Sequence, residues 1–211
     1  MFQYDNPFFQ GVRKLLGLIS LCAVFLLFCV PVFTAGASFA ALYEAVEKNM
    51  KHDRGYPAQE FWAEFRKNFK RATLCFLVIL AAAGICVTDL RILQVLTQAG
   101  KGYAGITVVF YVFLILIAVW AVWVLAQCVR FENTTGALLK NGLVLMLFHI
   151  PSSLGILGIL AAGVMIIYLL PVSILVMPGV MVWFITMLTE KVFRSHMTPE
   201  QRQQYDENNW I

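Results

Sequence analysis

The stretch that decides the fold runs from Asn141 to Thr189 and reads NGLVLMLFHIPSSLGILGILAAGVMIIYLLPVSILVMPGVMVWFITMLT. These 49 residues contain no Asp, Glu, Lys or Arg. A helix needs about 20 apolar residues to cross the hydrocarbon core of a bilayer, so the stretch is long enough for two crossings. Proline breaks a helix, and Pro171 and Pro178 lie near the middle of the stretch. We therefore expect two membrane spans here, at about 153–170 and 172–193.

Three other stretches also lack charged residues, at 15–43, 72–88 and 102–129. Over the whole chain, 60% of the residues are hydrophobic and only 13% are charged, whereas soluble domains carry about 25% charged residues. The net charge of +4 comes from lysines and arginines in loops and does not form one basic face. The composition excludes a soluble enzyme, a disordered chain and a nucleic-acid-binding module. It predicts an all-α protein that crosses a membrane several times.

We expect one transmembrane helical domain over residues 1–197 and a short polar tail over 198–211. The predicted spans are 15–32, 34–50, 72–90, 103–129, 153–170 and 172–193. Residues 15–43 are long for one crossing and short for two, with Pro31 and Gly36 in the middle as turn candidates. One crossing gives five spans in total, and a hairpin gives six.

The distribution of basic residues predicts the orientation, because cytoplasmic loops carry an excess of Lys and Arg. The loop after the first apolar stretch holds seven of them: Lys48, Lys51, Arg54, Arg66, Lys67, Lys70 and Arg71. This loop and both termini are therefore placed in the cytoplasm. A hairpin over residues 15–50 keeps Arg13 and Lys14 on the same side, which favours six spans.

Residues 57–70 form the pattern of an amphipathic helix. Phe61, Phe65 and Phe69 share one face, with Trp62 at its rim and basic residues at the end. This pattern is typical of a helix that lies in the cytoplasmic headgroup layer, either as a surface anchor or as a docking surface for a partner. A second interfacial helix is expected to start near Thr134 or Thr135.

The sequence contains no catalytic or metal-binding motif, and its five cysteines and three histidines show no ligand spacing. We therefore predict that the chain is not an enzyme and holds neither a cofactor nor a metal ion. Glu44 and His149 are the candidates for buried polar residues, although Glu44 also has Lys48 four residues later as a surface ion partner. An ion-driven transporter normally buries more ionisable groups than this, which counts against that function.

A run of small residues makes one helix smooth enough for another helix to approach it closely. The run comprises Gly36, Ala37, Ala40 and Ala41, and a second run lies at 155–163. The predicted partner interface consists of the first run and part of the amphipathic helix: Gly36, Ala37, Ala40, Ala41, Phe61, Trp62, Phe65 and Arg66. The alternative is that these small faces pack against other helices of the same chain.

Three sequence blocks occur in the order found in a known family. Residues 31–43 read PVFTAGASFAALY and residues 65–73 read FRKNFKRAT. The third block is RFENT at 130–134, followed by KNG at 140–142 and HIP at 149–151. In these blocks, which together cover most of the chain, the sequence resembles the YesL-like family of bacterial integral membrane proteins.

The resemblance implies a small multi-pass protein of the bacterial plasma membrane that is associated with carbohydrate uptake by ABC transporters. It brings no catalytic residues. The expected function is a non-enzymatic accessory subunit that contacts permease subunits and membrane lipid, stabilises or regulates the permease complex, and meets carbohydrate only through that complex. Nucleic acid is not an expected partner. A small stand-alone facilitator or transporter and a passive assembly scaffold remain as alternatives.

Overall fold

The computed structural model describes residues 7–52, 57–98 and 104–196, and this part of the chain is helical with no β-strand. The all-α prediction is therefore confirmed. The elements are α1 (Pro7–Cys29), η1 (Val32–Thr34), α2 (Ala35–His52), α3 (Pro57–Gln98), α4 (Ala104–Arg130), α5 (Thr135–Phe148), α6 (Ile150–Leu169), η2 (Pro171–Leu175) and α7 (Met177–His196). The predicted polar tail at 198–211 lies outside the described residues.

Residues 15–50 form two helices, as in the hairpin alternative. Helix α1 ends at Cys29, and the short 3-10 helix η1 follows Pro31, which cannot continue the α-helical hydrogen bonding. The hydroxyl of Thr34 donates a hydrogen bond to the carbonyl of Phe28 over 2.6 Å. This bond closes the turn, and α2 then runs back along α1.

The predicted interfacial helix 57–70 and the predicted span 72–90 are one continuous helix of 42 residues, α3. No glycine or proline follows Pro57 until Gly84, so the sequence has no strong helix breaker where a flat helix could turn into the membrane. The amphipathic stretch is thus an extension of the third span.

The long uncharged stretch divides as expected at the prolines, where η2 separates α6 from α7. Helix α6 begins earlier than the predicted span, at Ile150, because proline is well tolerated in a first turn and Pro151 lies there. Helix α5, which precedes it, is the second predicted interfacial helix and starts at Thr135.

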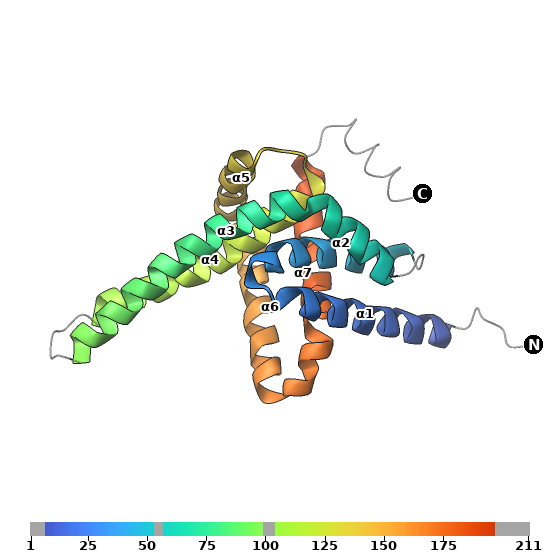
Figure 1. Ribbon diagram of the computed structural model, residues 1–211, viewed down its shortest axis with the longest axis horizontal. Coiled ribbons are helices and arrows are strands. Elements are labelled where there is room, and N and C mark those ends of the chain that lie inside the picture. Colours follow the sequence, from blue (N-terminus) through green and yellow to red (C-terminus); the bar gives the residue numbers. More distant parts are fainter. Residues whose placement is uncertain (1–6, 53–56, 99–103, 197–211) are drawn as a thin grey trace, which may run out of the picture.

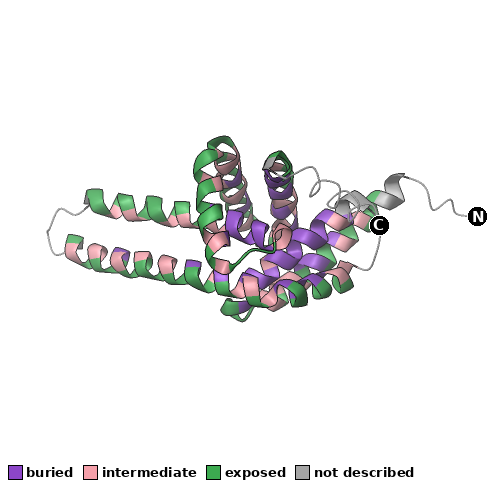
Figure 2. Cartoon of the chain, turned by 90° about the horizontal axis from the view of Figure 1, so that it is seen from above, coloured by how far each residue is buried: buried purple, intermediate pink, exposed green. Residues whose placement is uncertain are grey.

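The helices form a fork (Figure 1). The antiparallel pair α3 and α4 projects in one direction as an arm, and the pair α6 and α7 projects in another. The buried residues concentrate where these pairs meet α2, and the free part of the arm is mostly exposed (Figure 2). Among the largest fully buried side chains at this junction are Tyr43, Trp123, Phe193 and Leu42.

Four described helices are long and apolar enough to cross a membrane: α1, α3, α4 and α6. Between 11% and 28% of their apolar windows is buried inside the molecule, so most of each window faces outward, as hydrocarbon-facing helices do. The remaining two predicted spans, 34–50 and 172–193, correspond to α2 and to η2 with α7. Both of these helices carry charged residues in their C-terminal halves.

Candidate functional site

Arg130, the last residue of α4, is the centre of a buried group of charged side chains. Its Nε lies 2.6 Å from Oε1 of Glu190, and its Nη1 lies 2.7 Å from Oε2 of Glu44. Its Nη2 pairs with the carboxylate of Glu47. The Arg130 side chain is 7% exposed and those of the three glutamates are 3–10% exposed, so all four charges are largely removed from solvent.

Lys48 extends this group to a further helix. Its ammonium lies 3.4 Å from Glu44 Oε1 and 3.1 Å from Glu64 Oε1. The amide of Asn68 donates a hydrogen bond to the second oxygen of Glu64. We refer to Glu44, Glu47, Lys48, Glu64, Arg130 and Glu190 together as the ion cluster. It joins α2, α3, α4 and α7 where the two helix pairs meet α2, a junction that we call the root of the fork.

Tyr43 contacts two members of the ion cluster, Arg130 and Glu190. The Arg130 guanidinium carbon lies 5.7 Å from the centre of the Tyr43 ring, within the range of a cation–π contact. The Tyr43 hydroxyl lies 2.6 Å from the Thr189 hydroxyl and donates to Glu190 Oε1 over 3.0 Å. Glu190 therefore receives both a guanidinium and a phenol donor.

A buried arginine bound to carboxylates on separate helices fixes how those helices are placed. Removal of one partner from such a group leaves an uncompensated buried charge, at a cost of about 3–5 kcal/mol. A second arginine acts nearby, since Arg71 Nη1 donates to the carbonyl of Phe131 over 3.0 Å and ties α3 to the residue after α4. The root of the fork is thus held by ionic contacts as well as by apolar packing.

Glu60, in the first turn of α3, lies at the edge of the cluster. Burial raises the pKa of its carboxyl above the ordinary value; Lys48 opposes this shift, and the negative charges of Glu44 and Glu64 add to it. Its Oε2 is buried without a hydrogen-bond partner. The surroundings of Glu60 thus disfavour the charged form of its carboxyl.

The structure corrects the predicted role of the small-residue run. Ala37, Ala40 and Ala41 are fully buried, and a Cβ added at Gly36 would collide with Phe76 and lie 3.0 Å from the carbonyl of Ala72. At Gly36 the run packs against α3 of the same chain. It is therefore an internal packing face and is not available to a partner.

The residues of the predicted interface on α3 are partly buried in the protein and partly exposed at its surface. Phe61 and Phe65 are buried, with the Phe65 ring 4.9 Å from that of Phe28 on α1. Trp62 remains 44% exposed, and the guanidinium of Arg66 lies over its ring at 5.4 Å. Trp62 and Arg66 are the predicted interface residues that stay at the surface.

The two predicted buried polar residues lie in different places. Glu44 belongs to the ion cluster, where it binds Lys48, as the four-residue spacing suggests, and also Arg130. His149 lies between α5 and α6, is partly buried, and has its ring 6.4 Å from that of Trp123. The structure does not bring His149 to the cluster.

Sequence reasoning missed most of the cluster: it named Glu44 with its partner Lys48 and did not single out Arg130, Glu47 or Glu190 as buried charges. The available signal was that Glu44, Arg130 and Glu190 each directly adjoin a long uncharged stretch, and Arg130 also opens the RFENT block. Within the described residues, no group of three or more His, Cys, Asp or Glu side chains is arranged to hold a metal ion.

A family model described as "Protein of unknown function, DUF624" matches residues 15–90. The matched region covers most of α1, all of α2 and α3 as far as Leu90. It includes Glu44, Glu47, Lys48 and Glu64 of the ion cluster and ends before Arg130 and Glu190. No curated protein and no solved structure matched the chain.

Proposed function

We propose that this chain is a YesL-like, non-enzymatic accessory subunit of a bacterial carbohydrate ABC uptake transporter in the plasma membrane. It would stabilise or regulate the permease complex by binding one permease conformation better than another, since a ligand shifts an equilibrium only through such a difference. The match of residues 15–90 to DUF624, the family to which YesL-like proteins belong, supports the family part of this proposal.

The observation that carries the proposal is the α3–α4 arm. Away from the root of the fork, the two helices of the arm pack mainly against each other (Figures 1 and 2). Their outward surface is apolar and includes Leu80, Ile85, Val87 and Ile92 on α3 and Val108, Val109, Val112 and Phe113 on α4. An arm of this shape offers a long surface to the helices of a neighbouring subunit.

One face of the arm is suited to close helix contact. Ala81, Gly84 and Thr88 are exposed and share a face of α3, and a Cβ added at Gly84 would meet nothing within 4 Å. In membranes, helices associate through small residues that let their backbones approach. The small-residue contact with a partner is therefore proposed for α3 and not for the buried run on α2.

The charges of the ion cluster pair with one another, which favours this function over a stand-alone transporter. A transport path needs charged groups that face the bundle interior or a water-filled cavity. Glu44 is instead bound by Arg130 and Lys48. Glu44, the charged candidate for a transport path, is thus engaged in holding helices together.

The test is co-purification of the full-length tagged chain from native bacterial membranes in a mild detergent. Permease subunits of a carbohydrate importer should be retained. Gly84→Leu adds bulk to the small face and should lower the retained permease roughly tenfold, equivalent to about 1.4 kcal/mol of binding free energy. Ala118→Leu adds bulk at an exposed position on α4 and should leave retention unchanged.

Four outcomes would count against the proposal. A chain that purifies alone from native membranes lacks the proposed partner. Equal loss of permease in both variants would show that the small face of α3 is not a specific binding surface. Solute flux through liposomes that contain only this chain would favour the facilitator, and lower permease abundance without altered transport kinetics on deletion would favour the passive scaffold.

A further inference from the structure

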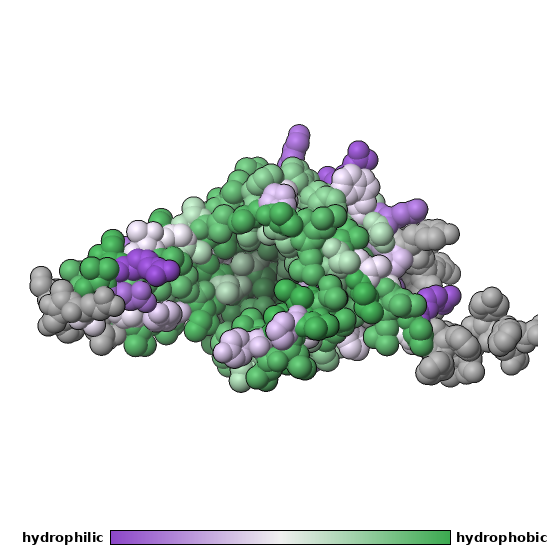
Figure 3. Space-filling view, turned by 60° about the horizontal axis from the view of Figure 1, so that its bottom comes forward, coloured by the Kyte–Doolittle hydropathy of each residue, from purple (hydrophilic) through white to green (hydrophobic). Residues whose placement is uncertain are grey.

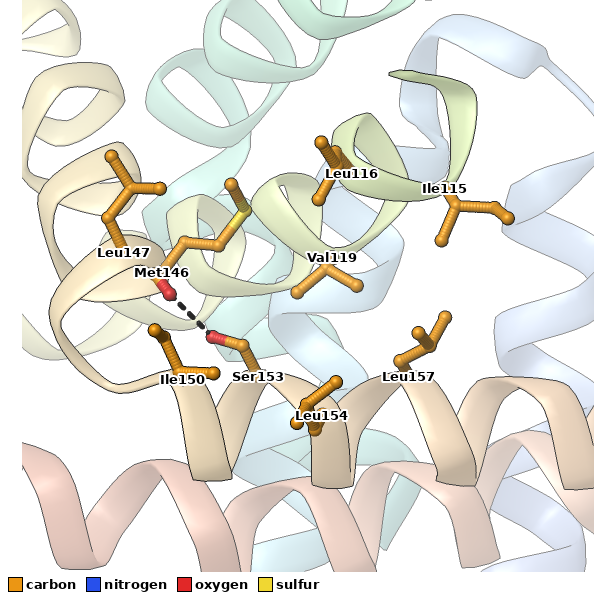
Figure 4. A pocket seen from close by; sticks show the side chains of 9 residues that line it. All are labelled: Ile115, Leu116, Val119, Met146, Leu147, Ile150, Ser153, Leu154 and Leu157. Atoms are coloured by element: carbon orange, nitrogen blue, oxygen red, sulfur yellow. Dashed lines mark hydrogen bonds between the residues drawn. The ribbon is translucent and has the colours of Figure 1, made fainter. Parts of the chain in front are cut away.

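A cleft of about 170 Å³ lies between α4, α5 and α6 (Figure 4). It is in the region where the arm and the α6–α7 pair diverge, and the surface there is hollowed and hydrophobic (Figure 3). Its lining residues come from three helices: Ile115, Leu116, Val119, Met146, Leu147, Ile150, Ser153, Leu154 and Leu157. The cleft is separate from the ion cluster and from the small face of the arm.

The chemistry of the lining selects an apolar ligand. Ser153 is the one lining residue with a polar side chain. Its hydroxyl donates to the carbonyl of Met146 over 2.9 Å and accepts from Nε1 of Trp123 over 3.1 Å. A polar ligand group that entered the cleft would lose its hydration and find little to bind, at a cost of about 1–3 kcal/mol.

The mouth of the cleft opens where membrane hydrocarbon is expected. Leu116, Ile150 and Leu154 lie at the cleft and are each more than 40% exposed. They belong to α4 and α6, two of the helices that are long and apolar enough to cross a membrane. The molecules expected next to the mouth are therefore lipid chains.

The size of the cleft decides between a lipid chain and a protein helix. An apolar cavity of about 150 Å³ is large enough for benzene, so the present cleft accommodates roughly six or seven carbon atoms. An α-helix with its side chains is about 10 Å wide and would overfill this space. A single flexible hydrocarbon chain fits.

We propose that this cleft binds the end of one membrane-lipid acyl chain, inserted between α4 and α6 below α5. The acyl chain would fill space that the protein's own side chains leave empty. It would thereby stabilise the angle between the arm and the α6–α7 pair. Each methylene group of the acyl chain that moves from the bilayer into the cleft gains van der Waals contacts with Leu116, Val119 and Leu157.

Photolabelling of the full-length chain tests this proposal. The chain is reconstituted in vesicles of phosphatidylethanolamine and phosphatidylglycerol that contain a phospholipid with a diazirine near the end of one acyl chain. Val119 and Val122 on α4 are 3% and 5% exposed, but only Val119 lines the cleft. After illumination, Val119 should carry the lipid adduct roughly ten times more often than Val122 by peptide mass spectrometry.

Leu157→Phe fills the cleft from α6 and should remove the adduct at Val119, while adducts on the exposed arm residues Ile85 and Val108 persist. Leu77→Phe, on the exposed surface of α3, is the matched control and should leave the Val119 adduct in place. Equally weak labelling of Val119 and Val122 in the wild type would overturn the proposal. So would a Val119 adduct that survives Leu157→Phe in a variant with unchanged thermal unfolding.

Discussion

Arg130 pairs with three carboxylates, which come from α2 and α7. Its planar guanidinium presents five donors in a fixed arrangement, so that one side chain can bind Glu44, Glu47 and Glu190 from different directions. A lysine is a compact charge with a single nitrogen and cannot reproduce this arrangement. The identity of this residue, and not only its charge, is needed at the root of the fork.

Replacement of Arg130 by alanine should be strongly destabilising, because three buried carboxylates lose their guanidinium partner. The expected decrease in the free energy of unfolding is about 3–5 kcal/mol. Arg91→Ala, at an exposed position on α3, should change it by less than about 0.5 kcal/mol. Thermal or denaturant unfolding of the purified chains in detergent measures both.

Glu44→Gln provides a milder variant if Arg130→Ala does not accumulate. It keeps the shape of the side chain and removes one of the carboxylates bound by Arg130 and Lys48. An intermediate loss of stability is expected. Wild-type stability in both cluster variants would contradict the structural role assigned to the cluster.

At the scale of elements, α2 is held against α3 by a small-residue face. Gly36 lies against Phe76 and the backbone of Ala72, while Ala37, Ala40 and Ala41 are fully buried. Small side chains here let α2 approach closely, and farther along the two helices Lys48 reaches Glu64. Close packing and the ion cluster therefore act together along one helix pair.

Gly36→Leu should disrupt this helix pair. The added side chain has no space between α2 and α3, and overpacking of this kind typically costs about 1–3 kcal/mol. Gly84→Leu, which meets open space on the arm, should leave the stability of the isolated chain within about 0.5 kcal/mol of the wild type.

The two glycine variants separate a structural from a binding effect. Unfolding measured in detergent should distinguish them without any partner present. If Gly36→Leu unfolds at the wild-type temperature, the close contact between α2 and α3 is not required for stability. If Gly84→Leu is also destabilised, a loss of permease on that variant no longer reports on a binding face.

At the scale of the whole molecule, the fork places its ionic root at one end. The cluster residues lie in the C-terminal halves of α2 and α7, at the end of α4 and near the start of α3. The predicted orientation puts all of these segments on the cytoplasmic side, next to the basic residues Arg66, Lys67 and Lys70. The tip of the arm and the turn at η2 are then on the outer side.

This orientation predicts which positions react with a membrane-impermeant maleimide applied to intact cells. Cysteine introduced at Arg91 or Tyr168 should be labelled from outside, because both positions are exposed near the outer ends of their helices. Cysteine at Lys67 or Lys140, also exposed, should be labelled only after the cells are opened. Labelling of position 67 in intact cells would reverse the layout.

The sequence by itself determined the fold class, the approximate spans and the turn at the prolines. These features depend on local properties, namely uncharged length, charge at the ends of apolar stretches and helix-breaking residues. The hairpin of α1 and α2 was one of two alternatives: the composition of residues 15–43 did not choose between them, and only the positions of Arg13 and Lys14 favoured the hairpin. In the structure, the turn at Pro31 is bridged by the hydrogen bond from the Thr34 hydroxyl to the Phe28 carbonyl.

Only the tertiary structure decided which small face is buried, which charges meet and where a cleft remains. Gly36 and Gly84 look alike in the sequence, yet one lies against Phe76 and the other faces open space. Arg130 lies 86 residues from Glu44 and 60 from Glu190 along the chain, so no local pattern links them. These pairings follow from how whole helices cross, because a side chain's partners depend on the packing angle and register of its helix as much as on its own chemistry.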